Sequence, residues 1–328
     1  MRVFLTGGTG YIGNRLALSL ANSGNEVHAL IRDPGSKNLP RHSNIKFFQG
    51  DLQNKSAIDS AINGCDKVIH SAAYTNLKCR KLDPFYQTNV IGTEHVCESA
   101  LNHGVEHLIY TSTLSVFGPA LYQVPIVESQ PRIESYANDY ELTKTMSEER
   151  IKSFGDDGLP YTILNLSRVY GPGLATFSNG VNSLIYKFIK GKVLFVPSNL
   201  DIEANYVYID DVLTAHKLVL NKGPQNDRFI IGGENSDYSN LFNKIKSISN
   251  SKITILKINY DIVRQFFRLL SGFSRFFGSE NSIHPGILDS LFTNRSATSE
   301  KAKHILGYQY TPLEIGLNKT VKFLKNDN

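Results

Sequence analysis

The sequence TGGTGYIG, residues 6–13, directly follows an apolar run and leads at once into a helical pattern of apolar residues. This order of strand, glycine turn and helix is typical of a dinucleotide-binding βα unit. Gly7 allows the tight turn, Gly10 lets the backbone approach a pyrophosphate, and Gly13 lets the helix pack closely on the sheet. The free N–H groups at the start of the helix then face the anion. The residues that we assign to the dinucleotide at this turn are Thr6, Gly7, Gly10, Tyr11, Ile12 and Gly13.

Outward from this turn, the first 170 residues alternate short β-branched runs with longer helical patterns, which predicts parallel strands joined by crossover helices. The strands are nearly continuous apolar runs, as expected where helices cover both faces of a sheet. We predict an α/β fold: a Rossmann domain with a doubly wound parallel sheet over residues 1–170, and a smaller mixed α/β substrate lobe over 171–328 with some return of chain to the first domain. The predicted strands are 2–6, 26–31, 45–49, 67–71, 107–111 and 161–166, and the predicted helices of this domain are 11–23, 55–62, 84–103 and 139–154.

The composition of the 328-residue chain, 41% hydrophobic and 20% charged, is that of an ordinary globular protein. Its net charge of +5 comes without a run of basic residues, so we do not expect nucleic-acid binding. Cys65, Cys79 and Cys97 lack the close spacing of a metal or redox site, so we expect free thiols and no metal. No apolar run is long enough for a secretory signal or a membrane span, and we therefore expect a cytoplasmic protein.

The end of the second predicted strand decides which dinucleotide binds. An acidic residue about twenty residues after the glycine turn would accept a hydrogen bond from the ribose 2′-hydroxyl of NAD. This chain has Ile31 there, followed by Arg32, whose guanidinium could pair with the extra phosphate of NADP. Asp33 could still serve a ribose hydroxyl, so NADP(H) is favoured and NAD(H) stays open.

A second informative stretch is NDYELTKTMSEE, residues 138–149. Tyr140 and Lys144 are four residues apart and project from one face of the predicted helix. A tyrosine hydroxyl has an unperturbed pKa of about 10, and a nearby ammonium favours the phenolate. Lys144 would therefore tune Tyr140 as a catalytic acid or base.

The fifth predicted strand ends in YTSTLSVFG, residues 110–118, which places several hydroxyls at the carboxyl edge of the sheet, where ligands of doubly wound folds bind. One of these hydroxyls should hold the substrate oxygen. Thr113 is our choice, and Ser112 is the alternative.

Taken together, these residues resemble the extended short-chain dehydrogenase/reductases, a group within the NAD-dependent epimerase/dehydratase superfamily. The resemblance covers nearly the whole chain. Besides the glycine turn and the Tyr-Lys pair it includes GDL at 50–52, HSAA at 70–73, TNVIGT at 88–93, VFG at 116–118, VYGPG at 169–173, VYIDDV at 207–212 and LGY at 306–308.

The resemblance implies a role for each matching residue. Asp51 and Leu52 would flank the adenine, Ala72 and Ala73 would line the path of the ribose, and Asn89 would support a proton relay. Thr113 would be the catalytic hydroxyl, Tyr140 the acid or base, and Lys144 would also hold the nicotinamide ribose, with Tyr170 close to nicotinamide and substrate. A homodimer through helices of the cofactor domain is usual in related proteins.

The chain departs from the pattern of these proteins at two places. Asn165 and Leu166 stand where an Arg-Pro or Asn-Pro pair is usual, and Phe117 stands where a tyrosine is common. The strand end around Arg32 and the stretch IIGGEN at 230–235 look more like the dihydroflavonol-reductase-like branch, whereas VYGPG is common among sugar enzymes.

These features lead to three hypotheses. In the first, the protein reduces a ketone or aldehyde with hydride from NADPH while Tyr140 protonates the oxygen and Thr113 holds it. In the second, the same trio serves a nucleotide-sugar epimerase or dehydratase that retains its cofactor. The third, a redox-sensing module without turnover, is disfavoured by the intact trio.

Residues 263–278, VRQFFRLLSGFSRFFG, predict an amphipathic helix. It could seek a surface, or it could roof the substrate pocket. We favour the roof, which would make part of the pocket apolar through Phe266, Phe267, Leu270 and Phe273.

Overall fold

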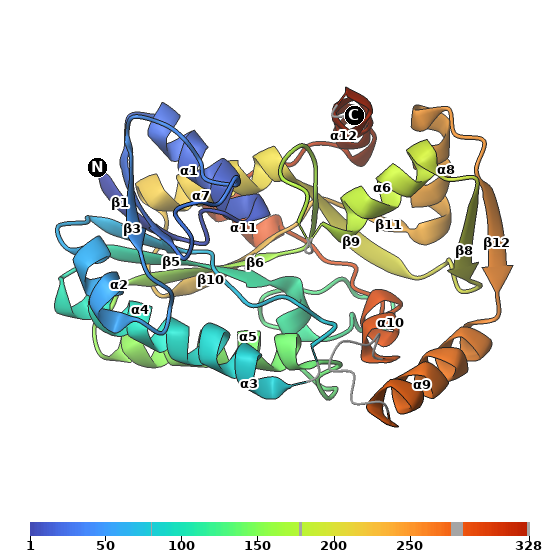
Figure 1. Cartoon of the computed structure of the whole chain (residues 1–328), viewed down its shortest axis with the longest axis horizontal. Helices are drawn as coiled ribbons and strands as arrows, with labels where there is room; N and C mark the ends of the chain where they lie inside the picture. The colour runs from blue at the N-terminus through green and yellow to red at the C-terminus, as the bar shows by residue number, and fades with distance from the viewer. Residues whose placement is uncertain (80, 177–178, 277–284, 327–328) are drawn as a thin grey trace.

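The computed structural model describes residues 1–79, 81–176, 179–276 and 285–326. Its centre is a seven-stranded parallel sheet in the order β10-β6-β5-β4-β1-β2-β3 (Figure 1). The strands are β1 (Arg2–Thr6), β2 (Glu26–Ile31), β3 (Ile45–Gln49), β4 (Lys67–His70), β5 (His107–Thr113), β6 (Tyr161–Leu166) and β10 (Asp227–Ile231). The predicted doubly wound Rossmann sheet is thus confirmed, and the chain crosses from one side of β1 to the other between β3 and β4.

Helices cover both faces of the sheet, as its apolar strands require (Figure 1). One layer packs on the apolar residues around Val3, Leu5 and Ile109, and the other packs around Phe4, Val68 and Leu108. Alternate residues of one strand therefore serve opposite cores. The first layer contains α1 (Tyr11–Asn22), α7 (Ile209–Lys222) and α11 (Glu300–Leu306), and the second contains α2 (Lys55–Ile62), α4 (Gly92–Asn102) and α5 (Asp139–Asp156).

The predicted helix over residues 84–103 is interrupted. A short helix α3 (Leu82–Phe85) passes into a π-helical turn over Tyr86–Ile91 before α4 begins. In this turn the carbonyl of Asn89 accepts hydrogen bonds from the hydroxyls of Thr93 and Ser147, at 2.5 and 2.6 Å. Such turns concentrate at functional sites, and this one carries a predicted site residue.

The second half of the chain builds a lobe beside the carboxyl end of the sheet (Figure 1). It contains a three-stranded sheet of β7 (Arg168–Tyr170), β9 (Glu203–Tyr208) and β11 (Glu234–Asp237), and a two-stranded sheet of β8 (Val193–Pro197) and β12 (Thr254–Ile258). Its helices are α6 (Gly180–Lys190), α8 (Tyr238–Ser249), α9 (Tyr260–Phe276), α10 (Pro285–Leu291) and α12 (Leu313–Asn326). Because β10, α7 and α11 return to the main sheet, the lobes are interleaved in sequence, and the domain boundary at residue 170 stays a prediction.

Over the described ranges, no helix combines the length and the apolar character that crossing a membrane would need. No group of three or more His, Cys, Asp or Glu side chains in these ranges has the geometry of a metal site.

Candidate active site

The glycine turn has the geometry that its sequence predicts. Gly7 has a φ of +80°, a value that favours glycine. A Cβ on Gly13 would lie 2.1 Å from the carbonyl oxygen of Gly7, so the helix can pack on the turn only without a side chain there. A Cβ on Gly10 would meet only that same oxygen, at 3.2 Å, and the first turn of α1 has neither a side-chain cap nor an acidic residue. These features fit the diphosphate of a dinucleotide.

Two side chains of the turn stabilise it from behind. Both Thr6 and Tyr11 are buried. The Thr6 hydroxyl accepts hydrogen bonds from the backbone N–H groups of Ser71 and Ala72, at 3.2 and 3.1 Å, and so joins the ends of β1 and β4. The Tyr11 hydroxyl donates to the carbonyl of Gly171 at 2.8 Å. Their side chains therefore hold the shape of the site, while the glycine backbone remains for the ligand.

The other residues assigned to the cofactor are distributed along the ends of β2, β3 and β4. Arg32 is exposed directly after β2, and no ion pair or hydrogen bond of its side chain is present within the described ranges. Asp51 is exposed, and its carboxylate accepts from the N–H of Gln53 at 2.9 Å. Leu52 is buried, whereas Ile12, Ala72 and Ala73 are partly exposed.

The predicted catalytic residues come from β5 and α5. Helix α5 begins at Asp139 because the side chain of Asn138 accepts a hydrogen bond from the N–H of Glu141 at 3.0 Å. Tyr140 is partly exposed, and burial raises the pKa of its hydroxyl to about 12 while the nearby Thr113 hydroxyl opposes that shift. The structure therefore brings Tyr140 and Thr113 together, but it leaves the phenol protonated at neutral pH.

Lys144 lies on the same face of α5 but is buried, with 1% of its surface exposed. Its ammonium donates to the Tyr110 hydroxyl at 2.6 Å and to the Thr111 carbonyl at 2.8 Å. Burial lowers the pKa of Lys144 to about 7. The predicted lowering of the Tyr140 pKa by Lys144 is absent from this arrangement, because Tyr110 and Thr111 hold the amine. Contact with a ribose would require the side chain to rotate away from Tyr110.

Asn89 connects three parts of the site from its π-helical turn. Its amide nitrogen donates to the carbonyl of Tyr74 at 3.2 Å and to the hydroxyl of Thr143 at 3.0 Å, and its oxygen accepts from the N–H of Tyr74 at 2.7 Å. The side chain is buried. It fixes the loop after β4 against α5, one residue from Lys144, and its role in a proton relay stays a prediction.

The position of Tyr170 corrects one expectation. This residue has no exposed surface, because β7 pairs with β9 and directs the ring into the core of the second lobe. Its hydroxyl donates to the carbonyl of Leu313 at 3.3 Å, and its ring packs against Gly316, where a Cβ would lie 2.2 Å from the Tyr170 oxygen. The side chain therefore cannot contact a nicotinamide from this position.

Sequence reasoning missed a buried carboxylate beside the end of β5, the strand that carries Thr113. Glu148 accepts hydrogen bonds from Ser112 at 2.5 Å and from Asn165 at 2.6 Å, and burial raises its pKa. Asn165 also donates to the Thr113 carbonyl at 3.3 Å. Because the Ser112 hydroxyl donates to Glu148, Thr113 is the hydroxyl of this strand end that lies near Tyr140. The spacing of Tyr140, Lys144 and Glu148 at intervals of four was a visible signal.

A second missed carboxylate is Glu141, which is 1% exposed. One oxygen accepts from Arg295 at 2.5 Å, and the other accepts from Arg132 at 2.8 Å. Burial alone would raise the pKa of this carboxyl, but the two guanidinium groups outweigh burial and hold the pKa below its usual range. Ser290 also donates to Glu141, at 3.1 Å. Glu141 therefore links the helix of the catalytic tyrosine to the second lobe.

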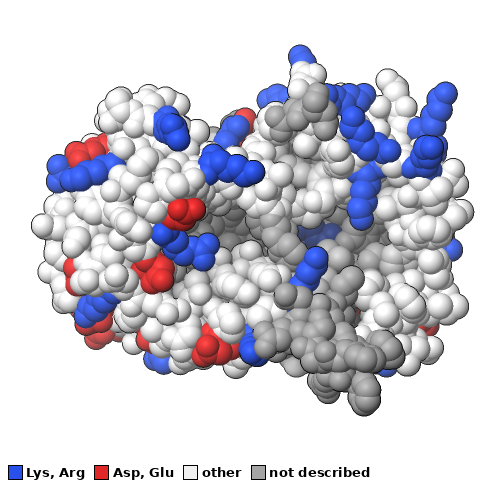
Figure 2. Space-filling view, in the orientation of Figure 1, with Lys and Arg blue, Asp and Glu red and all other residues white. Residues whose placement is uncertain are grey.

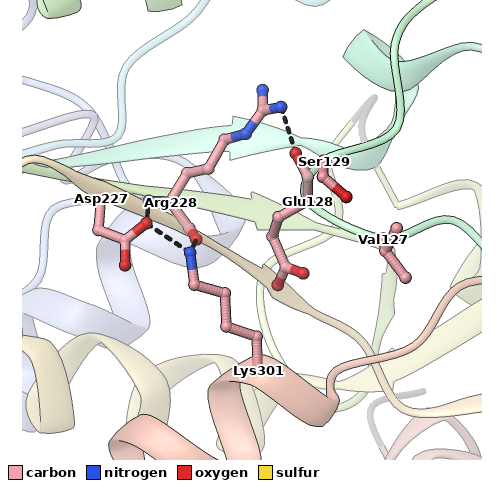
Figure 3. A pocket seen from close by; sticks show the side chains of 6 residues that line it. All are labelled: Val127, Glu128, Ser129, Asp227, Arg228 and Lys301. Atoms are coloured by element: carbon pink, nitrogen blue, oxygen red, sulfur yellow. Dashed lines mark hydrogen bonds and ion pairs between the residues drawn. The ribbon is translucent and has the colours of Figure 1, made fainter.

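The two lobes leave a hollow between them, with Lys or Arg side chains inside it (Figure 2). A separate shallow pocket lies at the edge strand β10 (Figure 3). There Lys301 donates to the carboxylate of Asp227 and to the carbonyl of Arg228, and Arg228 donates to the carbonyl of Glu128. None of the residues that line this pocket belongs to the predicted site. Their contacts join the edge strand β10 to Lys301 of α11 and to the segment around Glu128.

The fold and the glycine turn define a nucleotide-binding protein of the Rossmann type. Residues 3–232 match the model of the NAD dependent epimerase/dehydratase family. The chain belongs to this family, which relates it to the extended short-chain dehydrogenase/reductases and makes it a nicotinamide-dependent enzyme.

The chain is similar to a putative dihydroflavonol 4-reductase of Synechocystis sp., with 27% identity over 75% of this chain and 72% of that protein. It is also similar to a 2-alkyl-3-oxoalkanoate reductase of Stenotrophomonas maltophilia, with 29% identity over 66% of this chain and 64% of that protein. Its fold is similar to that of a UDP-glucose 4-epimerase of Thermotoga maritima in a structure with UDP-glucose, with a TM-score of 0.83 and 22% identity over 100% of this chain and 99% of that one.

The pairing of Glu141 yields a stability prediction. We expect Glu141→Ala to lower the free energy of unfolding by about 3 kcal/mol or more, because Arg132 and Arg295 would keep buried charges without a partner. Glu149→Ala is the matched control, since Glu149 lies on the same helix and pairs with Lys152 at the surface. The control should change stability by less than about 1 kcal/mol. Urea unfolding measures both, and equal losses would contradict the role of the ion pairs.

Proposed function

We propose that this enzyme reduces a ketone or aldehyde with NADPH, with Tyr140 as the acid and Thr113 as the residue that holds the carbonyl oxygen. The observation that carries the proposal is the position of Tyr140, in the first turn of α5, near Thr113 at the carboxyl end of β5. At this edge of a doubly wound sheet, a ligand that follows the glycine turn ends beside them. When bound, the nicotinamide supplies the hydride.

The protonation state of Tyr140 favours reduction. With its pKa raised to about 12 by burial, the phenol keeps its proton at neutral pH and can donate it to a carbonyl oxygen. Thr113 and Tyr140 would hold that oxygen between two hydroxyls and so fix the orientation of the substrate. If the Lys144 amine broke its hydrogen bond to Tyr110, its positive charge would stabilise negative charge on the substrate oxygen.

An aromatic or lipophilic carbonyl compound is the substrate that we propose, because the second lobe holds an aromatic cluster near the segment of Ser290 and Arg295 that contacts Glu141. Phe292 packs against Tyr238 and Tyr260, with ring centroids 5.1 and 5.8 Å apart. Arg168 donates to the Tyr238 hydroxyl at 2.6 Å, which holds that ring in place. Two relatives that are named as reductases of carbonyl compounds support the same choice.

The choice of NADPH rests on Arg32. Its guanidinium is exposed at the end of β2, where the ribose 2′-position of a bound dinucleotide is expected. The loop that follows is fixed to α1, because Asn14 donates to the carbonyl of Asn38 at 2.9 Å. An anchored loop that carries a free guanidinium suits a 2′-phosphate. A cytoplasmic location and a homodimer stay predictions.

Tyr140→Phe tests the assignment of the acid. We expect turnover of a carbonyl substrate to fall at least about a hundredfold, because the proton donor is lost, while the affinity for NADPH is unchanged. Tyr136→Phe is the control, since Tyr136 lies one turn before the helix, packs under Arg132 and loses only a surface hydroxyl. Steady-state kinetics and cofactor titration measure these quantities. Full activity of Tyr140→Phe would refute the proposal.

Arg32→Ala tests the choice of cofactor. We expect the KM for NADPH to rise about tenfold or more and the KM for NADH to stay the same, because only the 2′-phosphate loses its partner. Arg41→Ala, an exposed arginine further along the same loop, should leave both values unchanged. An equal rise for both cofactors would assign Arg32 a role other than phosphate recognition.

The second candidate, a nucleotide-sugar epimerase or dehydratase, is favoured by the VYGPG turn, in which Gly171 accepts the hydrogen bond from Tyr11. The two candidates differ in whether the cofactor is retained. We expect the purified protein to release little nucleotide on denaturation and to take up NADPH. Abundant released NAD, identified by mass spectrometry, would favour the epimerase or dehydratase instead.

A further inference from the structure

Helix α9 exposes apolar side chains along one face. Ile262, Phe266 and Leu269 are 61%, 58% and 73% exposed, and Leu270 is 42% exposed. Their spacing of three and four residues places them on one side of the helix. That this helix roofs the substrate pocket stays a prediction: Phe266 and Leu270 are exposed, Phe267 is half-buried, and the side chain of Phe273 lies outside the described residues.

One side of α9 packs on the protein through half-buried residues, both apolar and polar: Tyr260, Val263, Arg264 and Phe267. Asp289 of α10 accepts hydrogen bonds from Tyr260 at 2.9 Å and from Arg264 at 3.0 Å. Tyr260 also packs its ring on Phe292. These contacts fix the rotation of the helix about its axis, so Ile262, Phe266 and Leu269 lie on its solvent side. An amphipathic helix on a globular protein normally turns such residues toward the core.

Further apolar side chains are exposed on the neighbouring two-stranded sheet. Strand β12 leads into α9, and both lie with β8 at one end of the molecule (Figure 1). Phe195 and Leu256 are paired neighbours in this sheet and are 64% and 43% exposed, beside Val193. We call the surface formed by β8, β12 and α9 the end face; its exposed apolar residues are Val193, Phe195, Leu256, Ile262, Phe266, Leu269 and Leu270.

The sequence segments that contain and adjoin the end face are basic. Two of their cations, Arg264 and Lys244, pair with Asp289 and Glu314. Residues 180–200 and 244–270 contain nine Lys and Arg and a single acidic residue, Asp261. Their net charge of +8 exceeds the +5 of the whole chain, so the remaining residues together carry −3. Lysines at 187, 190, 192, 252 and 257 are exposed. Figure 2 shows basic side chains gathered on the upper part of this lobe, on the side of α6 and α8, with few acidic ones among them.

We propose that the end face binds the surface of a lipid bilayer that contains anionic lipids. Exposed Phe and Leu side chains can enter the boundary between headgroups and acyl chains, and the lysines around them attract acidic headgroups. The partner is not a second copy of this chain, because two end faces of the same high positive charge would repel each other. This proposal does not depend on the reaction proposed above.

The test is sedimentation of the full chain with lipid vesicles. We expect binding to vesicles of phosphatidylcholine with about a third phosphatidylglycerol, little binding to pure phosphatidylcholine, and weakening by salt. The double variant Phe266→Glu with Leu269→Glu should lower the partition coefficient at least about tenfold, because two apolar side chains are replaced by charges. Ile305→Glu is the matched control, an isoleucine 52% exposed on α11, away from the end face, and it should bind like the parent chain.

A second double variant tests the basic residues of the end face without changing helix α9. Lys252→Glu with Lys257→Glu leaves the exposed apolar residues intact and should also abolish the preference for phosphatidylglycerol. The proposal is overturned if the parent chain does not sediment with the anionic vesicles, or if Ile305→Glu loses as much binding as the α9 variant. It is also overturned if light scattering finds that the parent chain is a dimer and the α9 variant a monomer, while the parent chain binds no vesicles.

Discussion

The contact on which the rest of the structure depends is the approach of α1 to the turn after β1. A side-chain carbon on Gly13 would lie 2.1 Å from the Gly7 oxygen, and one on Gly7 would lie 2.8 Å from the backbone of Ala72. Three segments of backbone therefore meet without side chains between them. This close packing aligns the ends of β1 and β4 and directs the N–H groups of α1 into the site. Helix α5 and the second lobe are arranged around this contact between α1 and the glycine turn.

The sequence was sufficient to predict the central sheet because its strands are buried on both faces and read as apolar runs. Six of the seven strands, β1 to β4, β6 and the core of β5, were predicted at or near their observed bounds. The roles of Lys144, Glu141 and Glu148 could not be predicted in the same way. Each depends on a partner far along the chain, such as Arg295 for Glu141, and periodicity carries no information about such pairs. The rotation of α9 about its axis likewise depends on Asp289, which lies on another helix.

The electrostatics of the site are governed by burial more than by pairing. Burial raises the pKa of Tyr140 and lowers that of Lys144, so both groups shift toward their uncharged forms. His70, between Thr6 and Thr93, is also neutral, with its pKa lowered to about 3 by burial. Charge is concentrated instead in the Glu141 cluster, one residue from Tyr140, where two arginines balance the carboxylate.

The position of Glu141 has a consequence for how the enzyme moves. Its carboxylate is bound from one side by Arg132, which also donates to the carbonyl of Ser115 just beyond β5, and from the other by Arg295 of the second lobe. Any hinge motion that separates the lobes must pull on the first turn of α5, which contains Tyr140. Opening of the lobes and displacement of Tyr140 would then be one mechanical event.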